Sequence, residues 1–240
     1  MTVFSSAVMD KLAQVSVATI TTTLYKRGFR NQLIQQVFPV GGARKKRLIG
    51  PAYTLRYMPA REDLNKLEVF RDPSHPQRKA VEECPPGYVL VMDSRKDARA
   101  ASAGGILLTR LQQRGVAGVV TDGGFRDSPE IAALDMPAYH HHASPPTNLT
   151  HHQAIDINVP IGCGDAPVFP GDLIFGDEEG VVVIPAHVAQ ECAQEAFEMT
   201  AFEDFVTEKV RQGRSVVGLY PATDPKTLDE FAAWRKANNR

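Results

Sequence analysis

The sequence contains few cysteines, no long apolar run and no excess of charge of either sign. Its 240 residues include three cysteines, one tryptophan, 27 basic and 28 acidic side chains, for a net charge of −1. This balance argues against a protein that attracts nucleic acid or an acidic membrane through its overall field. No apolar stretch approaches the roughly 20 residues needed to span a bilayer. We therefore expect neither a nucleic-acid partner nor a membrane segment.

The cysteines, Cys84, Cys163 and Cys192, are widely spaced, with neither CxxC nor zinc-finger spacing. An odd and scattered set of this kind does not indicate a disulfide framework. The first residues also lack the basic start and apolar core of a signal peptide. These features predict a cytoplasmic protein, and the length allows one large domain or two small ones.

Two charged segments are interpreted as solvated. The basic run at 44–47 (RKKR) could bind an anion, but it is more typical of an exposed loop. The acidic run at 177–179 (DEE) precedes a glycine between two apolar stretches, which indicates a hairpin turn facing water. Neither segment predicts a reactive site.

The central part of the chain predicts an α/β fold. Residues 50–57 and 88–93 have the composition of strands, and residues 106–115 form a helix with glycines at its entrance and exit. The β-branched run at 116–121 is a further strand. A strand, helix and strand of this length form a βαβ crossover, so strands 88–93 and 116–121 should be parallel neighbours.

The remaining elements extend this prediction to a single domain over 1–220 with a tail over 221–240. Because several strands follow residue 137, a purely doubly wound fold is not expected. Helical spacing covers 6–27, and a break is possible at 19–23, where threonines weaken helix propensity. The other predicted elements are short helices at 63–70, 77–83 and 128–134, strands at 137–140 and 158–163, a hairpin of 168–177 with 180–185, a long helix at 186–212 and a terminal helix at 228–236.

The most informative segment is 116–128 (VAGVVTDGGFRDS). Its apolar run ends in two glycines, which predict a sharp turn that presents Arg126 and Asp127 at the end of a strand. An arginine can bind a substrate carboxylate, and an aspartate is a hard oxygen ligand for a metal ion. A surface ion pair that caps the next helix explains the local sequence equally well.

The glycines at the helix entrance, Gly104 and Gly105, indicate a possible anion site. Neither a Walker loop nor a dinucleotide fingerprint is present. The first-turn amides of a helix favour a carboxylate, and both this entrance and the turn with Arg126 should lie at the carboxyl edge of the sheet. The sequence thus predicts a small carboxylate held by the amides of Ile106 and Leu107 and by the guanidinium of Arg126.

Histidines gather at 140–142 and 151–152. On a strand, His140 and His142 would face the same way and could share a metal ion. No carboxylate or cysteine partner appears at a recurrent metal-site spacing, however. Surface or interface histidines are therefore the favoured interpretation, and a histidine metal site is the alternative.

Three segments together resemble one known family. They are 50–54 (GPAYT), then Gly104 to Leu107 leading to 121–127 (TDGGFRD), then 170–185 (PGDLIFGDEEGVVVIP). Their order is similar to that of the regulator of ribonuclease activity A family, which includes the 4-hydroxy-4-methyl-2-oxoglutarate and 4-carboxy-4-hydroxy-2-oxoadipate aldolases. The resemblance spans roughly residues 8–220. It implies a swivelling β/β/α domain with a central mixed sheet and a long C-terminal helix.

The resemblance also implies a homotrimer or homohexamer with active sites between subunits. In such a site Mg²⁺ or Mn²⁺ is bound by an aspartate, here Asp127, together with waters. Arg126 matches the arginine that binds and polarises the 2-oxo acid. A glutamate from a neighbouring C-terminal helix approaches the metal waters, and Glu203 is the best match, with Glu198 in reserve.

One position departs from the family pattern. The aldolases carry an aspartate where this chain has Gly105, and that aspartate helps to hold a water that acts as a base. Retro-aldol cleavage suffers most from its loss, because a hydroxyl proton must be removed, whereas oxaloacetate decarboxylation mainly needs a Lewis acid.

Two functions remain open on this basis. The first is a class II, metal-dependent lyase that releases pyruvate from small 2-oxo acids by aldol cleavage, by oxaloacetate decarboxylation or by both. The alternative is a non-enzymatic regulator that binds and inhibits a ribonuclease. The intact Arg126–Asp127 pair favours the enzyme, because the resemblance implies that the regulator of the family does without this aspartate.

Overall fold

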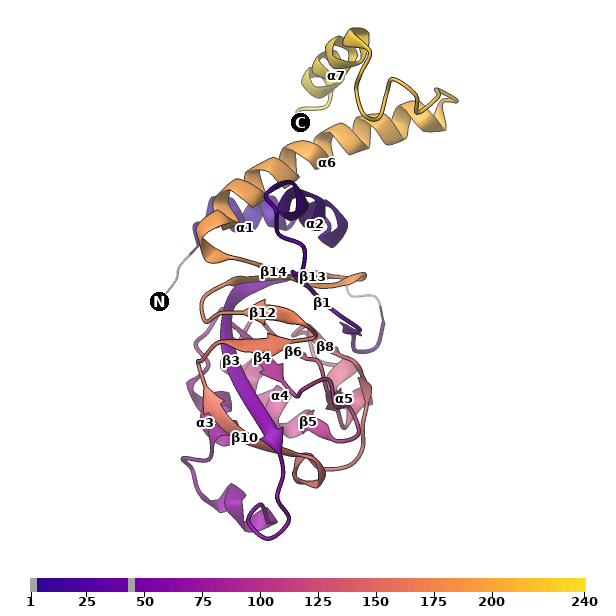
Figure 1. Cartoon of the computed structure of the whole chain (residues 1–240). Helices are drawn as coiled ribbons and strands as arrows, with labels where there is room; N and C mark the ends of the chain where they lie inside the picture. The colour runs from indigo at the N-terminus through magenta and orange to yellow at the C-terminus, as the bar shows by residue number, and fades with distance from the viewer. Residues whose placement is uncertain (1–3, 43–45) are drawn as a thin grey trace.

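The protein is described by a computed structural model that covers residues 4–42 and 46–240. A central mixed sheet carries helices against it, and the long helix α6 (Ala189–Arg211) leads away from the body toward the C-terminus (Figure 1). The sheet has the strand order β1-β14-β13-β3-β4-β6-β8-β2, and β10 pairs with β3 beside this path. The α/β fold class with a central mixed sheet and a long C-terminal helix is therefore confirmed.

The middle of the sheet is parallel and carries the predicted crossover. Its strands follow one another across the sheet, each parallel to the next. Val89, Leu90 and Val91 are fully buried, as expected for strands covered on both faces. The four strands are β3 (Leu48–Pro59), β4 (Val89–Asp93), β6 (Gly118–Thr121) and β8 (Ala138–His140), connected through the helices α3 (Pro76–Glu83), α4 (Gly105–Gln113) and α5 (Ser128–Ala132).

Antiparallel strands complete the sheet. The predicted C-terminal hairpin is present, but Gly171, with φ +88°, turns the chain and separates residues 166–168 from the hairpin. The strand predicted at 158–163 begins only at Ile161, and the strand before it was not anticipated. The antiparallel strands of the central sheet are β13 (Leu173–Asp177), β14 (Gly180–Ile184), β10 (His152–Ile157), β1 (Leu33–Ile34) and β2 (Phe38–Pro39). The strands β11 (Ile161–Cys163) and β12 (Ala166–Val168) pair with each other in a separate two-stranded sheet.

The N-terminal segment forms two helices, so the prediction of one helix over 6–27 is wrong. The chain breaks between α1 (Ser6–Leu12) and α2 (Val17–Lys26), before the threonines rather than within them. Ser16 is the cause, because its hydroxyl accepts a hydrogen bond from the backbone N–H of Thr19 at 3.1 Å.

Asp177 also contacts the first residue of α2. The interpretation of 177–179 as wholly solvated is therefore corrected. Its side chain is buried, and its Oδ2 accepts a hydrogen bond from the backbone N–H of Val17 at 2.8 Å. The same oxygen lies 2.9 Å from Nη1 of Arg47, at the end of the basic run. Residues 44 and 45 of that run lie outside the described residues.

Apolar clusters hold these layers together. One lies between the sheet and α3, α4 and α5, and a second lies beneath β11 and β12. A third joins α1, α2 and α6 to the outer hairpin. The helix α7 (Pro225–Ala237) packs against the far end of α6 through Phe205, Phe231 and Trp234. It corresponds to the helix expected at 228–236.

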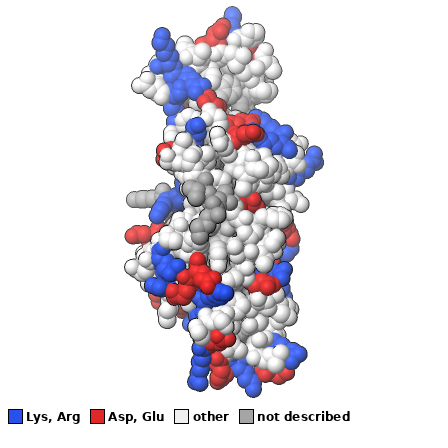
Figure 2. Space-filling model, turned by 90° about the vertical axis from the view of Figure 1, so that its left-hand side faces the viewer, with Lys and Arg blue, Asp and Glu red and all other residues white. Residues whose placement is uncertain are grey.

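The outer surface matches the balanced composition. Basic and acidic side chains are interspersed over the face drawn in Figure 2, without a broad field of one sign. Among the described helices, none is both long and apolar enough to cross a membrane. Cys84, Cys163 and Cys192 are buried free thiols.

The close contact between β6 and β3 predicts that Gly118→Ala is strongly destabilising. A Cβ on Gly118 would lie 2.1 Å from Cδ1 of Leu48 and 2.8 Å from the carbonyl oxygen of Pro137. Overpacking of this kind costs about 1–3 kcal/mol of unfolding free energy, which denaturant titration measures. The matched control is Gly162→Ala, because that Cβ would meet no described atom within 4 Å. Equal stability of the two variants would contradict this packing.

Candidate active site

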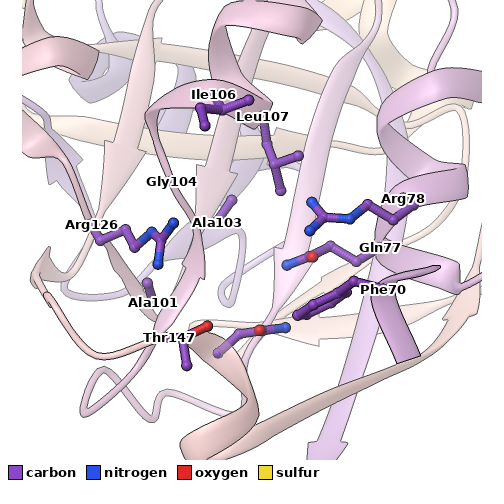
Figure 3. A pocket seen from close by; sticks show the side chains of 11 residues that line it. Phe70, Gln77, Arg78, Ala101, Ala103, Gly104, Ile106, Leu107, Arg126 and Thr147 are labelled. Atoms are coloured by element: carbon purple, nitrogen blue, oxygen red, sulfur yellow. The ribbon is translucent and has the colours of Figure 1, made fainter. Parts of the chain in front are cut away.

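A small cavity of about 130 Å³ lies at the edge of the sheet. It is bounded by the 3-10 helix η1 (Leu67–Arg71), by α3, by the entrance of α4 and by the 3-10 helix η2 (Asn148–Thr150) (Figure 3). The cavity opens to solvent on one side, so a small ligand could reach it.

Two short parallel strands bring the predicted anion and metal residues together. The strands β5 (Ala101–Ala103) and β7 (Gly124–Phe125) pair in parallel, and each leads directly into a helix. The backbone N–H of Arg126 donates to the carbonyl oxygen of Ala103 at 3.2 Å, which locks the two exits side by side. The turn with Arg126 and the glycine entrance of α4 therefore form one wall of the cavity.

Asp127 links these two exits through its side chain. Its backbone is left-handed, with φ 58° and ψ 40°, at the N-cap of α5. Its Oδ2 does not cap α5 but accepts a hydrogen bond from the backbone N–H of Gly105 at 3.0 Å, and it lies 3.5 Å from Nε of Arg126. The helix-capping interpretation of the pair is thus corrected, because the carboxylate caps the preceding helix, α4, rather than the next one.

Gly104 is required by this arrangement. A Cβ there would lie 2.7 Å both from Nε of Arg126 and from Oδ2 of Asp127. At Gly105 the space is less restricted, since a Cβ would lie 3.2 Å from Cβ of Asp127 and 3.6 Å from Cβ of Glu130. The first glycine therefore admits the ion pair, whereas a side chain at the second requires Asp127 to shift by a few tenths of an ångström.

The first-turn amides differ in their availability. Leu107 donates its N–H to the carbonyl oxygen of Gly104 at 3.1 Å, and Gly105 donates to Asp127. The N–H of Ile106 lies between them in the first turn, where helical N–H groups lack an intrahelical partner. Of the two amides expected to bind a carboxylate, that of Ile106 is the better placed.

Sequence reasoning missed the opposite wall, which includes Gln77 and Arg78 on α3. Nε2 of Gln77 donates to the carbonyl oxygen of Ser102 at 2.7 Å and lies 3.2 Å from the hydroxyl of Tyr57, which also donates to that carbonyl. The guanidinium of Arg78 stacks over Phe70, with Cζ 4.4 Å from the ring centroid. No spacing signal marks these residues, because only the fold brings α3 to the cavity.

Arg78 and Arg126 approach the cavity from opposite sides (Figure 3). Burial lowers the pKa of Arg78, and the charge of Arg126 lowers it further. An arginine still remains protonated at neutral pH, since its ordinary pKa lies far above neutrality. No acidic side chain is found among the described residues that line the cavity. The cavity is therefore suited to an anion.

The expected glutamates lie elsewhere in this chain. Glu203 accepts hydrogen bonds from the hydroxyls of Thr19 and Tyr220 at 3.1 and 3.2 Å. It belongs to α6, which Figure 1 shows far from α3 and α4. Glu198 pairs with Arg235, at 2.6 Å between Oε2 and Nη1. Neither glutamate lines the cavity of its own subunit.

The described residues contain no cluster of three or more His, Cys, Asp or Glu side chains that could hold a metal ion. The described residues 140–152 therefore give no support to the alternative of a histidine metal centre. Asp127 fits a different kind of site, because its side chain is 43% exposed and offers a single carboxylate. Mg²⁺ is commonly held by one or two carboxylates and several waters.

The histidines are mainly packing groups. His140 stacks on Phe125, with ring centroids 5.7 Å apart, and His141 stacks on His142 at 5.0 Å. The expectation of surface histidines is wrong for His152, which is fully buried. Its burial follows from the unforeseen strand β10.

Comparison with known proteins places this geometry in a family. Residues 6–183 match the family model described as RraA-like, Aldolase/RraA. The chain therefore belongs to the RraA-like family. A solved structure of Streptomyces coelicolor RraAS2, described as an unusual member of the RNase ES inhibitor RraA protein family, has a TM-score of 0.73 and 29% identity. That match covers 84% of this chain and 96% of RraAS2.

Two relatives share the name "Putative 4-hydroxy-4-methyl-2-oxoglutarate aldolase". The protein from Halalkalibacterium halodurans is 40% identical over 122 residues, which are 49% of this chain and 56% of that protein. The protein from Burkholderia mallei is 32% identical over 153 residues, which are 63% of this chain and 83% of that protein. The chain thus spans little more than half the length of the first of these relatives.

The packing of His140 predicts an acid-shifted titration. Burial, followed by the charges of His142 and His141, lowers the pKa of His140 to about 4. An unfolded histidine has a pKa of about 6.5, so the unfolded state takes up the proton first. This contribution to the unfolding free energy is complete above about pH 6.5 and falls as the pH drops toward 4. NMR titration of the ring checks it, with His140→Gln to assign the signal; a midpoint near 6.5 would refute the prediction.

Proposed function

We propose that this chain is a divalent-metal-dependent carbon–carbon lyase that acts on small 2-oxo acids and releases pyruvate. The observation that carries the proposal is the pair at the α4 entrance: Arg126 faces a small anion cavity, and Asp127 is held beside it by the N–H of Gly105. Such a pair supplies a cation for the substrate and a carboxylate for a metal from one turn of the chain.

Each residue has a defined task in this proposal. The N–H of Ile106 and the positive end of the α4 dipole bind the substrate carboxylate. The guanidinium of Arg126 donates to the 2-oxo oxygen and stabilises the negative charge that develops there as the carbon–carbon bond breaks. Asp127 would hold Mg²⁺ or Mn²⁺, which when bound supplies a Lewis acid for the 2-oxo group.

The missing carboxylate at Gly105 bears on the type of bond cleavage. Aldol cleavage needs a base for the substrate hydroxyl, whereas loss of CO₂ from oxaloacetate moves the electron pair of the broken carbon–carbon bond onto the 2-oxo group and needs no base. Arg126 would stabilise the charge on that oxygen, and a proton taken up from solvent at carbon would convert the enolate to pyruvate. Oxaloacetate decarboxylation is therefore at least as well supported as cleavage of 4-hydroxy-4-methyl-2-oxoglutarate.

We also propose that the site is completed in a trimer or hexamer. Glu203 lies on α6, far from the cavity of its own chain, so it could act only at the site of a neighbouring subunit.

The likeness to RraAS2 favours one second candidate, a regulator that binds a ribonuclease. That function requires stable ribonuclease binding without turnover of any 2-oxo acid.

The metal assignment predicts that Asp127→Asn retains the fold but loses activity by about 100-fold or more, in line with the several kcal/mol that a Lewis acid contributes. An Asn side chain can still accept the hydrogen bond from Gly105, but it lacks the negative charge. Pyruvate release from oxaloacetate and from 4-hydroxy-4-methyl-2-oxoglutarate is measured through lactate dehydrogenase, with enzyme-free metal controls. EDTA should abolish the wild-type activity and Mg²⁺ or Mn²⁺ should restore it; full activity in EDTA would refute the metal mechanism.

The role of Gly105 predicts that Gly105→Asp shifts the reaction toward aldol cleavage. The new carboxylate restores a base at the helix entrance, although its Cβ would press on Asp127 at 3.2 Å. We expect the ratio of aldol cleavage to decarboxylation to rise about 10- to 100-fold, at the lower end of general base effects. Gly105→Asn has the same shape without the base and should leave the ratio unchanged. An equal rise in both variants would contradict the assignment.

A further inference from the structure

The wall opposite Arg126 contains charged and polar groups that the reaction at the 2-oxo group does not use. Arg78 points into the cavity from α3 (Figure 3). No ion pair from a described residue neutralises it, and its guanidinium lies over the ring of Phe70, with Cζ 4.4 Å from the ring centroid. An arginine without a carboxylate partner is matched to a planar, bidentate anion.

A second observation points to a ligand at this wall. Asn148 lines the cavity and is 5% exposed, yet its Nδ2 donates to no described residue. A buried donor without a partner loses its hydrogen bond to water and gains none in return, so a ligand acceptor would relieve this penalty. By contrast, the neighbouring amide of Gln77 is already bonded to Ser102.

These groups set the charge of the ligand. Two guanidinium groups face one space of about 130 Å³ that no acidic side chain lines in the described chain. One carboxylate at Arg126 and the α4 entrance leaves the charge of Arg78 uncompensated. A ligand with carboxylates at both ends neutralises both walls.

We propose that Arg78 binds the second carboxylate of a dicarboxylic 2-oxo acid and that the buried amide of Asn148 donates a hydrogen bond to the same ligand. This rests on the proposed function, in which the first carboxylate and the 2-oxo group lie at Arg126 and Ile106. Arg78 is thus a specificity-determining residue, which selects dicarboxylic over monocarboxylic 2-oxo acids.

The test measures binding rather than turnover. Calorimetry in the presence of Mg²⁺ compares 2-oxoglutarate, which has two carboxylates, with pyruvate, which has one. Arg78→Gln should weaken 2-oxoglutarate binding about 10- to 100-fold, as expected for a lost hydrogen bond to a charged group, and change pyruvate binding less than about 2-fold. Arg78→Lys should recover part of the loss, because it restores the charge without the fork.

Two further variants sharpen the result. Lys79→Ala removes the adjacent cation on α3, which does not line the cavity, and should bind both acids as the wild type does. Asn148→Asp keeps the side-chain shape but replaces the donor by a repelling carboxylate, so it should weaken 2-oxoglutarate binding at least as much as Arg78→Gln. Circular dichroism melting confirms that each variant is folded.

The outcomes separate this inference from the proposed function. If Arg78→Gln weakens both acids equally, or neither, the assignment of Arg78 is overturned even if the protein is an active lyase. Wild-type affinity of Asn148→Asp overturns the role of the amide. Arg78-dependent binding of 2-oxoglutarate without turnover of any 2-oxo acid supports the anchor and overturns the lyase.

Discussion

The hydrogen bond from the N–H of Gly105 to the carboxylate of Asp127 organises the candidate site. It joins the entrance of α4 to the entrance of α5, two turns that are 22 residues apart in the chain. The same carboxylate restrains Arg126 and occupies one of the first-turn donors of α4. The bond therefore holds the carboxylate of Asp127 at the N-terminus of α4, beside the cavity wall formed by Arg126.

This interaction depends on the parallel sheet beneath it. β4, β6 and β8 lie in sequence order and in parallel, so the segments that follow them must leave from the same edge. The small sheet of β5 and β7 then brings the two exits within hydrogen-bonding distance. Gly104 permits this approach because any side chain would collide with Arg126 and Asp127.

Local patterns were sufficient to predict that Arg126, Asp127 and the α4 entrance lie side by side. The β-branched run before Arg126, the paired glycines and the helix after Gly105 each have a local signature, and the crossover rule places them at one edge. The opposite wall could not be found in this way. Arg78 lies on an ordinary short helix and Asn148 begins the short 3-10 helix η2, and only the packing of α3 and η2 against β5 brings them to the cavity.

Competing local interactions explain the other differences. The threonines of α2 suggested a break inside the helix, but the capping hydroxyl of Ser16 and the buried carboxylate of Asp177 set its start. Asp177 is 160 residues away from the N–H of Val17 that it binds, so no short window of sequence reveals the contact. An acidic residue next to a turn is usually solvated. Asp177 is buried because the sheet places the start of α2 above it.

The charge balance of the cavity connects these constraints to chemistry. With glycine at position 105, the entrance of α4 carries one carboxylate, Asp127, whereas Arg78 and Arg126 both line the cavity. Interactions between charges are stronger in a partly buried cavity than in water, so the excess of positive charge favours states in which the ligand gains negative charge. An electron pair released onto a 2-oxo group is such a state. In the proposed lyase, a second carboxylate at position 105 would weaken this bias while supplying a base, so the residue at this position would balance stabilisation of the electron pair against removal of a proton.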